Sequence, residues 1–113
     1  MVRGVQITLG TTGARTGEPR TATLYAWEDG DRLVLIGSRG GASRHPGWVH
    51  NLRANPEAMV AQGRSERRYL AREVDGAERE RLWRLAADRF PMYDRYAART
   101  DRRIPVFLLE PIE

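Results

Sequence analysis

The chain has 113 residues, a formal net charge of +4, and 41% hydrophobic and 30% charged residues, with no cysteine and no lysine. This length and composition are typical of one globular domain, which we assign to residues 1–113. Disulfide bonds, thiolate metal sites, cysteine nucleophiles and lysine Schiff bases are therefore excluded.

Strand-like runs dominate the first third of the chain. Val5–Leu9, Thr21–Trp27 and Arg32–Ser38 are rich in β-branched, aromatic and aliphatic residues, and the Asp-Gly within Glu28–Asp31 predicts a hairpin turn between the last two runs. The centre of the third run, Leu33–Ile36, is apolar on both faces. This pattern predicts a central strand that is covered on both sides.

The middle of the chain is predicted to form a short helix and a second hairpin. Gly47–Ala54 carries its apolar residues at helical spacing, and Asn55-Pro56 ends it because a residue before proline is pushed out of the helical region. Glu57–Gln62 and Ser65–Val74 are strand-like runs separated by Gly63-Arg64.

The last part of the chain contains the one long helix. Asp75, with Glu78 three residues later, resembles a capping box at its start, and Pro91 ends it. A shorter polar helix is predicted over Met92–Thr100, and a last strand over Ile104–Leu109, before Pro111. The buried face of the long helix is predicted to be formed by Leu82, Leu85, Ala86 and Phe90.

The order of these elements indicates the fold class. Helices do not alternate with strands, so a doubly wound parallel sheet is disfavoured. We predict an α+β, mainly β fold: a small antiparallel barrel of about six strands, with one long helix and two short helices packed at its side.

Positive charge is concentrated near two glycine-rich segments. Residues 1–70 contain ten arginines and six acidic residues, whereas residues 71–113 contain nine of each. Within the first part, Thr11–Arg20 and Ser38–Arg53 hold five arginines against the single acid Glu18. Glycine lets backbone N–H groups approach a ligand, and guanidinium groups grip phosphates, so an anion site is predicted. The alternative is a mobile loop whose arginines are only solvated.

Other signals for chemistry are weak. His45 and His50 lie five residues apart, off the i, i+4 spacing of a helical metal site, and no metal is predicted. No serine nucleophile motif is present, which argues against acyl transfer. Tyr93 and Tyr96 would share one helical face, where they contact a substrate or cap a core; Trp48 likewise either packs in the core or forms the wall of a ligand site.

Four motifs occur in an order that resembles the deazaflavin-dependent nitroreductase and quinone reductase family. Members of this family are oxidoreductases with a split antiparallel β-barrel that bind the deazaflavin coenzyme F420. The resemblance covers nearly the whole chain. The matching segments are Thr11–Arg20, Ser38–Ala42, His45–Pro56 and Thr100–Val106.

This resemblance implies a site for F420, whose phosphate and oligoglutamate tail would be held at the first segment and whose ring would lie on the next two. Ala14 stands where many members have a base, and Arg39 where lysine is common. The implied coenzyme-binding residues are Ala14, Arg15, Thr16, Arg20, Thr23, Leu24, Tyr25, Ile36, Gly37, Ser38, Arg39, Gly40, Gly47, Trp48, Val49, His50 and Asn51.

The same resemblance implies that reduced F420 gives a hydride to a small aromatic acceptor, such as a quinone, a nitro-aromatic compound or an enone. The residues implied to face this acceptor are Tyr25, Ser38, Tyr93 and Tyr96. Their hydroxyls would stabilise the oxygen that gains negative charge. Phe90 stands where a well-known member has a third tyrosine, which puts nitro-aromatic activation in doubt.

Two other functions stay open: a split-barrel oxidoreductase that binds FMN, and an arginine-rich nucleic-acid-binding module. Of the three functions, we expect the F420-dependent oxidoreductase, with no nucleic-acid partner and with the protein as a monomer or a homodimer. No run of apolar residues is long enough to span a bilayer, and the first residues do not resemble a signal peptide. A cytoplasmic protein is therefore expected, at the membrane surface if the acceptor is a quinone.

Overall fold

The computed structural model describes residues 2–112, so the two end residues of the predicted domain lie outside the described part. The strands are β1 (Gly4–Thr12), β2 (Pro19–Asp29), β3 (Arg32–Ile36), β4 (Glu57–Gln62), β5 (Ser65–Glu73) and β6 (Val106–Pro111). The helices are α1 (Gly47–Ala54), α2 (Gly76–Ala87) and α3 (Met92–Arg99), together with the short 3-10 turn η1 (Arg39–Gly41). Among residues 2–112, no helix is long and apolar enough to cross a membrane.

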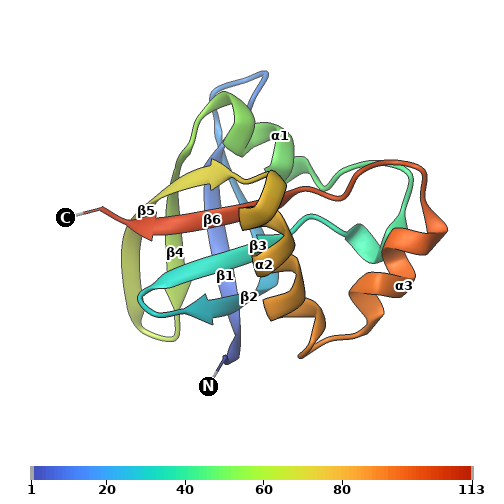
Figure 1. Ribbon diagram of the computed structural model, residues 1–113. Helices are drawn as coiled ribbons and strands as arrows, with labels where there is room; N and C mark the ends of the chain where they lie inside the picture. The colour runs from blue at the N-terminus through green and yellow to red at the C-terminus, as the bar shows by residue number, and fades with distance from the viewer. Residues whose placement is uncertain (1, 113) are drawn as a thin grey trace.

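The six strands form a closed antiparallel barrel (Figure 1). Each strand pairs with its neighbour in the order β1-β2-β3-β6-β5-β4, and pairing between β1 and β4 closes the ring. The long β1–β2 ladder runs from Gly4↔Trp27 to Thr12↔Pro19. This architecture confirms the predicted mainly β barrel with one longer and two shorter helices.

The inside of the barrel is a continuous apolar core. Inward-facing residues alternate along the strands, as in β1, where Val5, Ile7 and Leu9 are buried. Helix α1 covers one end of the barrel (Figure 1), and its Trp48, Val49 and Leu52 belong to the same core. Burial of this apolar stripe fixes where α1 sits.

A second apolar cluster lies outside the barrel, between strands β2, β3 and β6 and the helices α2 and α3. Strand β3 contributes to both clusters: Leu33 and Leu35 point into the barrel, whereas Val34 and Ile36 point toward the helices. The prediction of a central strand covered on both sides is confirmed.

Several predicted boundaries differ from the structure. Strand β1 continues to Thr12 and β2 begins at Pro19, since the two backbones stay paired across these residues. Strand β3 ends at Ile36. The N–H of Gly37 still donates to the carbonyl of Pro105, at 2.9 Å, but Pro105 has no N–H with which to continue the ladder. Strand β6 begins at Val106 and includes Pro111.

The predicted capping box is wrong, and so is part of the predicted helix face. Asp75 is the N-cap of α2, but its side chain makes no capping hydrogen bond. The carboxylate of Glu78 instead accepts two hydrogen bonds from Arg72, at 2.8 and 3.0 Å. Phe90 lies beyond the end of α2 and is 36% exposed, whereas Trp83 packs on the buried face.

Candidate functional site

Three neighbouring cavities follow α1 along one side of the barrel. The arginine cavity, of about 800 Å³, and the middle cavity, of about 520 Å³, share Arg20, Gly47 and Asn51. The middle cavity and the tyrosine cavity, of about 340 Å³, share Arg39 and Trp48. Because they have residues in common, the three cavities lie next to one another, and we refer to them together as the groove, with an arginine end and a tyrosine end.

The arginine cavity has a positive lining, although two of its three arginines pair with acidic residues outside that lining. It is lined by Arg15, Arg20 and Arg53 and by no acidic residue. Arg53 is held by two hydrogen bonds to the Glu73 carboxylate, at 2.8 and 2.9 Å, which lower the pKa of that carboxyl. The contact between Arg20 and Glu18 is long, at 3.4 Å, and both side chains are well exposed. Such a pair contributes little and can exchange for a ligand anion.

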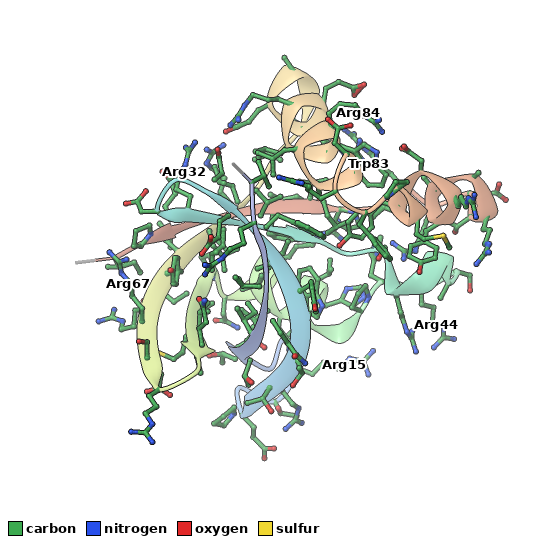
Figure 2. All side chains as sticks on the ribbon, turned by 90° about the horizontal axis from the view of Figure 1, so that it is seen from below. Arg15, Arg32, Arg44, Arg67, Trp83 and Arg84 are labelled. Atoms are coloured by element: carbon green, nitrogen blue, oxygen red, sulfur yellow. The ribbon has the colours of Figure 1, made fainter. Side chains whose placement is uncertain are left out.

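The loop that presents Arg15 is folded back on itself. The N–H of Gly13 donates to the Glu18 carbonyl at 2.8 Å, and the N–H of Gly17 donates to the Gly13 carbonyl at 2.9 Å. Gly17 has a φ of +73°, a conformation that glycine adopts without strain. Figure 2 shows Arg15 on the opposite side of the barrel from Arg67 of β5.

Asn51 ties this loop to α1. Its side-chain oxygen accepts a hydrogen bond from the N–H of Ala14 at 2.9 Å, and its amide nitrogen donates to the Thr11 hydroxyl at 3.1 Å. Both polar atoms of the side chain are thus engaged within the protein. The structure therefore gives Asn51 a role in shaping the arginine cavity, in addition to lining it.

We expect Asn51→Ala to lower the free energy of unfolding by about 1–3 kcal/mol, because two hydrogen bonds are lost and the N–H of Ala14 loses its partner. The released loop should also bind anions more weakly. Thermal unfolding gives the first quantity, and titration of the proposed coenzyme gives the second. Wild-type affinity in the folded variant would show that the loop keeps its shape without this tie.

The four hydroxyl-bearing residues predicted to face an acceptor meet at the other end of the groove. Tyr25 from β2, Ser38 after β3, and Tyr93 and Tyr96 from α3 all line the tyrosine cavity. Their burial differs: the Tyr25 side chain is 56% exposed, whereas Tyr93 is 7% exposed. Phe90 completes the aromatic wall, with its ring centroid 4.9 Å from that of Tyr93.

The phenol of Tyr93 is held in place by Trp27. The indole N–H of Trp27 donates to the Tyr93 oxygen at 2.9 Å in a buried hydrogen bond. Burial is the main cause that raises the pKa of Tyr93, so the phenol stays protonated at neutral pH. Since Trp27 occupies an acceptor position of the oxygen, the phenol proton is left to donate to a ligand.

The structure does not bring three of the predicted coenzyme residues to the groove. Thr23 is exposed on β2 and lines none of the three cavities. The side chain of Val49 is fully buried in the barrel core. Gly37 packs against Val49 and Pro105, where an added Cβ would lie 2.9 Å from the Val49 side chain.

The remaining predicted residues lie along the groove, together with others that the sequence did not single out. Pro46, which the middle and tyrosine cavities share, was not predicted. Arg53 was not among the predicted coenzyme residues, but it is one of the five clustered arginines that predicted an anion site. Among residues 2–112, no three histidine or acidic side chains come together in a way that could hold a metal ion.

Comparison with known proteins gives a consistent result. The family model described as F420H(2)-dependent quinone reductase matches residues 1–111. The chain is 39% identical, over 104 residues, to an F420H(2)-dependent quinone reductase of Mycobacterium tuberculosis (strain ATCC 25618 / H37Rv), with 89% of this chain and 70% of the relative covered.

Solved structures agree with the sequence relatives. An F420-H2 dependent reductase (FDR-A) has a TM-score of 0.84 and 39% identity, over 93% of each chain. A structure described as a domain-swapped dimer has the same TM-score and identity, over 93% of this chain and 79% of the other.

Proposed function

The chain belongs to the F420H(2)-dependent quinone reductase family, and from this premise we propose that it transfers a hydride from reduced F420 to a small aromatic acceptor such as a quinone. The protein is then an oxidoreductase in which the cofactor performs the electron transfer. The protein's contribution is then binding, orientation and charge stabilisation.

The observation that carries this proposal is the change of character along the groove. One end has arginines and no acidic lining residue, and the other end is aromatic with hydroxyl groups. A molecule with a phosphate, several carboxylates and a flat ring fits such a groove, since anions pair with guanidinium groups and rings pack on aromatic walls. The chemistry of the lining residues therefore fits F420.

In this proposal, each end of the groove has its own task. Arg15 and Arg20 hold the phosphate and the carboxylates, with Ala14 and Thr16 beside them, while Trp48 and Arg39 border the ring.

The tyrosine end would bind and orient the acceptor. When bound, reduced F420 supplies a hydride. The Tyr93 phenol, oriented by Trp27, would donate its proton in a hydrogen bond to the acceptor oxygen that gains negative charge. Tyr25, Ser38 and Tyr96 offer further hydroxyls at the same cavity.

The two alternatives have less support. Eight arginines form ion pairs with acidic residues among those that the structure describes, so much of the positive charge is neutralised locally and does not form a surface for nucleic acid. FMN carries one phosphate and leaves most of the arginine cavity without an anionic partner. We therefore favour F420 over FMN.

Titration of the pure protein with F420 and with FMN, followed by the fluorescence of each ring, tests the proposal. We expect saturable binding of F420 and much weaker binding of FMN. Binding of FMN alone would make the cofactor assignment wrong, and steep salt-dependent saturation by nucleic acid without F420 binding would support the third function. Turnover of reduced F420 with quinones, nitro-aromatics and enones then identifies the acceptor class.

We also propose that the protein works as a monomer or a homodimer, at the membrane surface when the acceptor is a lipid-soluble quinone. The domain-swapped dimer of a relative supports association of two copies. Sedimentation at equilibrium, without and with lipid vesicles that contain the quinone, measures both properties.

A further inference from the structure

The segment Thr100–Val106, the last of the four motifs, lines none of the three cavities of the groove. Its third residue, Arg102, is half-buried, and the guanidinium of Arg102 lies among backbone carbonyls. It donates to the carbonyls of Ala42 at 2.8 Å, Gly37 at 3.1 Å and Ser38 at 2.7 Å. One side chain thus bridges residues more than 55 positions away in the sequence.

These carbonyls belong to the segment that leaves β3 and continues through η1. Ser38, Arg39 and Gly40 of this segment line the tyrosine cavity, and Arg39 also lines the middle cavity. The guanidinium therefore contacts the back of the segment whose other side faces the groove. A planar fork with five N–H donors suits this arrangement, and lysine could not reproduce it.

The backbone of this segment is strained and needs external support. Arg39 has a φ of +46° and is the one non-glycine residue with positive φ within residues 2–112. Gly40 and Gly41 follow with φ of +62° and +81°, and a Cβ on Gly41 would lie 3.0 Å from the Tyr96 carbonyl oxygen. A non-glycine residue in this conformation persists only where its surroundings hold it.

We propose that Arg102 is a positioning residue for hydride transfer, which holds Ser38, Arg39 and Gly40 against the groove with His45 as its side-chain partner. This inference rests on the proposed function for its catalytic consequence. The clamp itself is a property of the protein without any ligand, so it can be tested separately.

His45 makes the clamp dependent on pH. Its Nδ1 atom lies 2.8 Å from an Nη1 donor of Arg102, so it must be unprotonated to accept this hydrogen bond. Burial first, and then the charges of Arg102 and Arg53, lower the pKa of His45; the neighbouring His50 acts in the same direction and Glu73 in the opposite one. A lowered pKa means that the neutral imidazole, which accepts the hydrogen bond, is kept at neutral pH and is lost only in acid.

Arg102→Gln and Arg102→Lys are the test variants, and Arg103→Gln is the matched control, since it removes the same charge at the next, exposed position. Without coenzyme, amide hydrogen exchange over residues 37–45 is expected to be about tenfold faster or more in Arg102→Gln than in the control, while core strands keep their protection. With F420 and acceptor, the kcat/KM of Arg102→Gln should fall by about tenfold or more relative to the control. The kcat/KM of Arg102→Lys should lie between those of Arg102→Gln and the control. Exchange equal to that of the control would overturn the clamp.

A second measurement remains valid if Arg102→Gln does not fold. The kcat/KM of the wild-type enzyme should fall by about threefold or more between about pH 7 and pH 5. His45→Asn should flatten this fall, because an asparagine oxygen accepts the hydrogen bond at every pH, and Arg103→Gln should retain it. An unchanged acid limb in His45→Asn would contradict the role of His45. Fast exchange in Arg102→Gln, together with no oxidation of reduced F420 by the wild type, would reject the proposed function and keep the clamp.

Discussion

Replacing Arg15 and Arg20 together by alanine is expected to raise the dissociation constant of F420 by about 10²- to 10⁴-fold. In the proposed site, each guanidinium would provide a charge-assisted hydrogen bond worth roughly 1.5–3 kcal/mol, or about ten- to a hundredfold in affinity. Both line the arginine cavity; Arg20 contacts Glu18 at 3.4 Å, but this exposed pair is weak and can exchange for a ligand anion. The single variants should each show about half of this free energy, provided that the two contacts act independently.

The measurement is a fluorescence titration with two ligands. One is F420, and the other is its chromophore without the phosphate and the glutamates. The double variant should bind the second ligand as the wild type does, because the aromatic part of the groove is unchanged. This comparison separates loss of the anion site from general damage to the protein.

A matched control is available on the other side of the barrel. Arg64→Ala with Arg67→Ala also removes two positive charges, but neither residue lines the groove, and Figure 2 places Arg67 far from Arg15. We expect this control to weaken F420 binding by less than about threefold, through long-range electrostatics alone. Equal losses in the two double variants would mean that the coenzyme senses only net charge and would remove the arginine site.

Local sequence patterns predicted most of the helices and strands, because apolar periodicity and helix-ending residues largely determine where these elements form. The helix over Gly47–Ala54 has the predicted bounds, since its apolar stripe must cover the barrel end and Asn55-Pro56 stops the helix. The two-sided apolar run of β3 likewise implied its central place. By contrast, the extension of β1 to Thr12 depends on pairing with β2. The polar residues at this end of the two strands give no local signal for that pairing.

The site was harder to predict at single residues than as a region. Thr23 sits one position away from the inward-packed Leu24, and strand alternation alone turns it outward. Val49 belongs to the apolar stripe of its helix, so its side chain is buried in the barrel core. The contacts of Arg102 join residues more than 55 positions apart, and no local pattern encodes them.

Tyr93→Phe is expected to have the second large effect, a fall in turnover of about 10²-fold with little change in the affinity for F420. Removing one donor to an oxygen that becomes negative in the transition state typically costs this much. The buried N–H of Trp27 would also lose its acceptor, so the free energy of unfolding should fall by about 1–3 kcal/mol. Steady-state turnover, coenzyme titration and thermal unfolding measure the three quantities.

Trp27→Phe distinguishes catalysis from packing in this prediction. It breaks the same hydrogen bond and destabilises the protein, but it leaves the Tyr93 phenol at the cavity. Turnover should therefore fall much less than in Tyr93→Phe, even where the two variants are equally destabilised. Equal losses of turnover would assign the effect to packing of the aromatic wall, and an equal loss of coenzyme affinity in Tyr93→Phe would place this tyrosine against the F420 ring.

Because burial raises the pKa of Tyr93, the donor should remain protonated through neutral and mildly alkaline pH, so turnover that depends on it should show no alkaline fall below about pH 10.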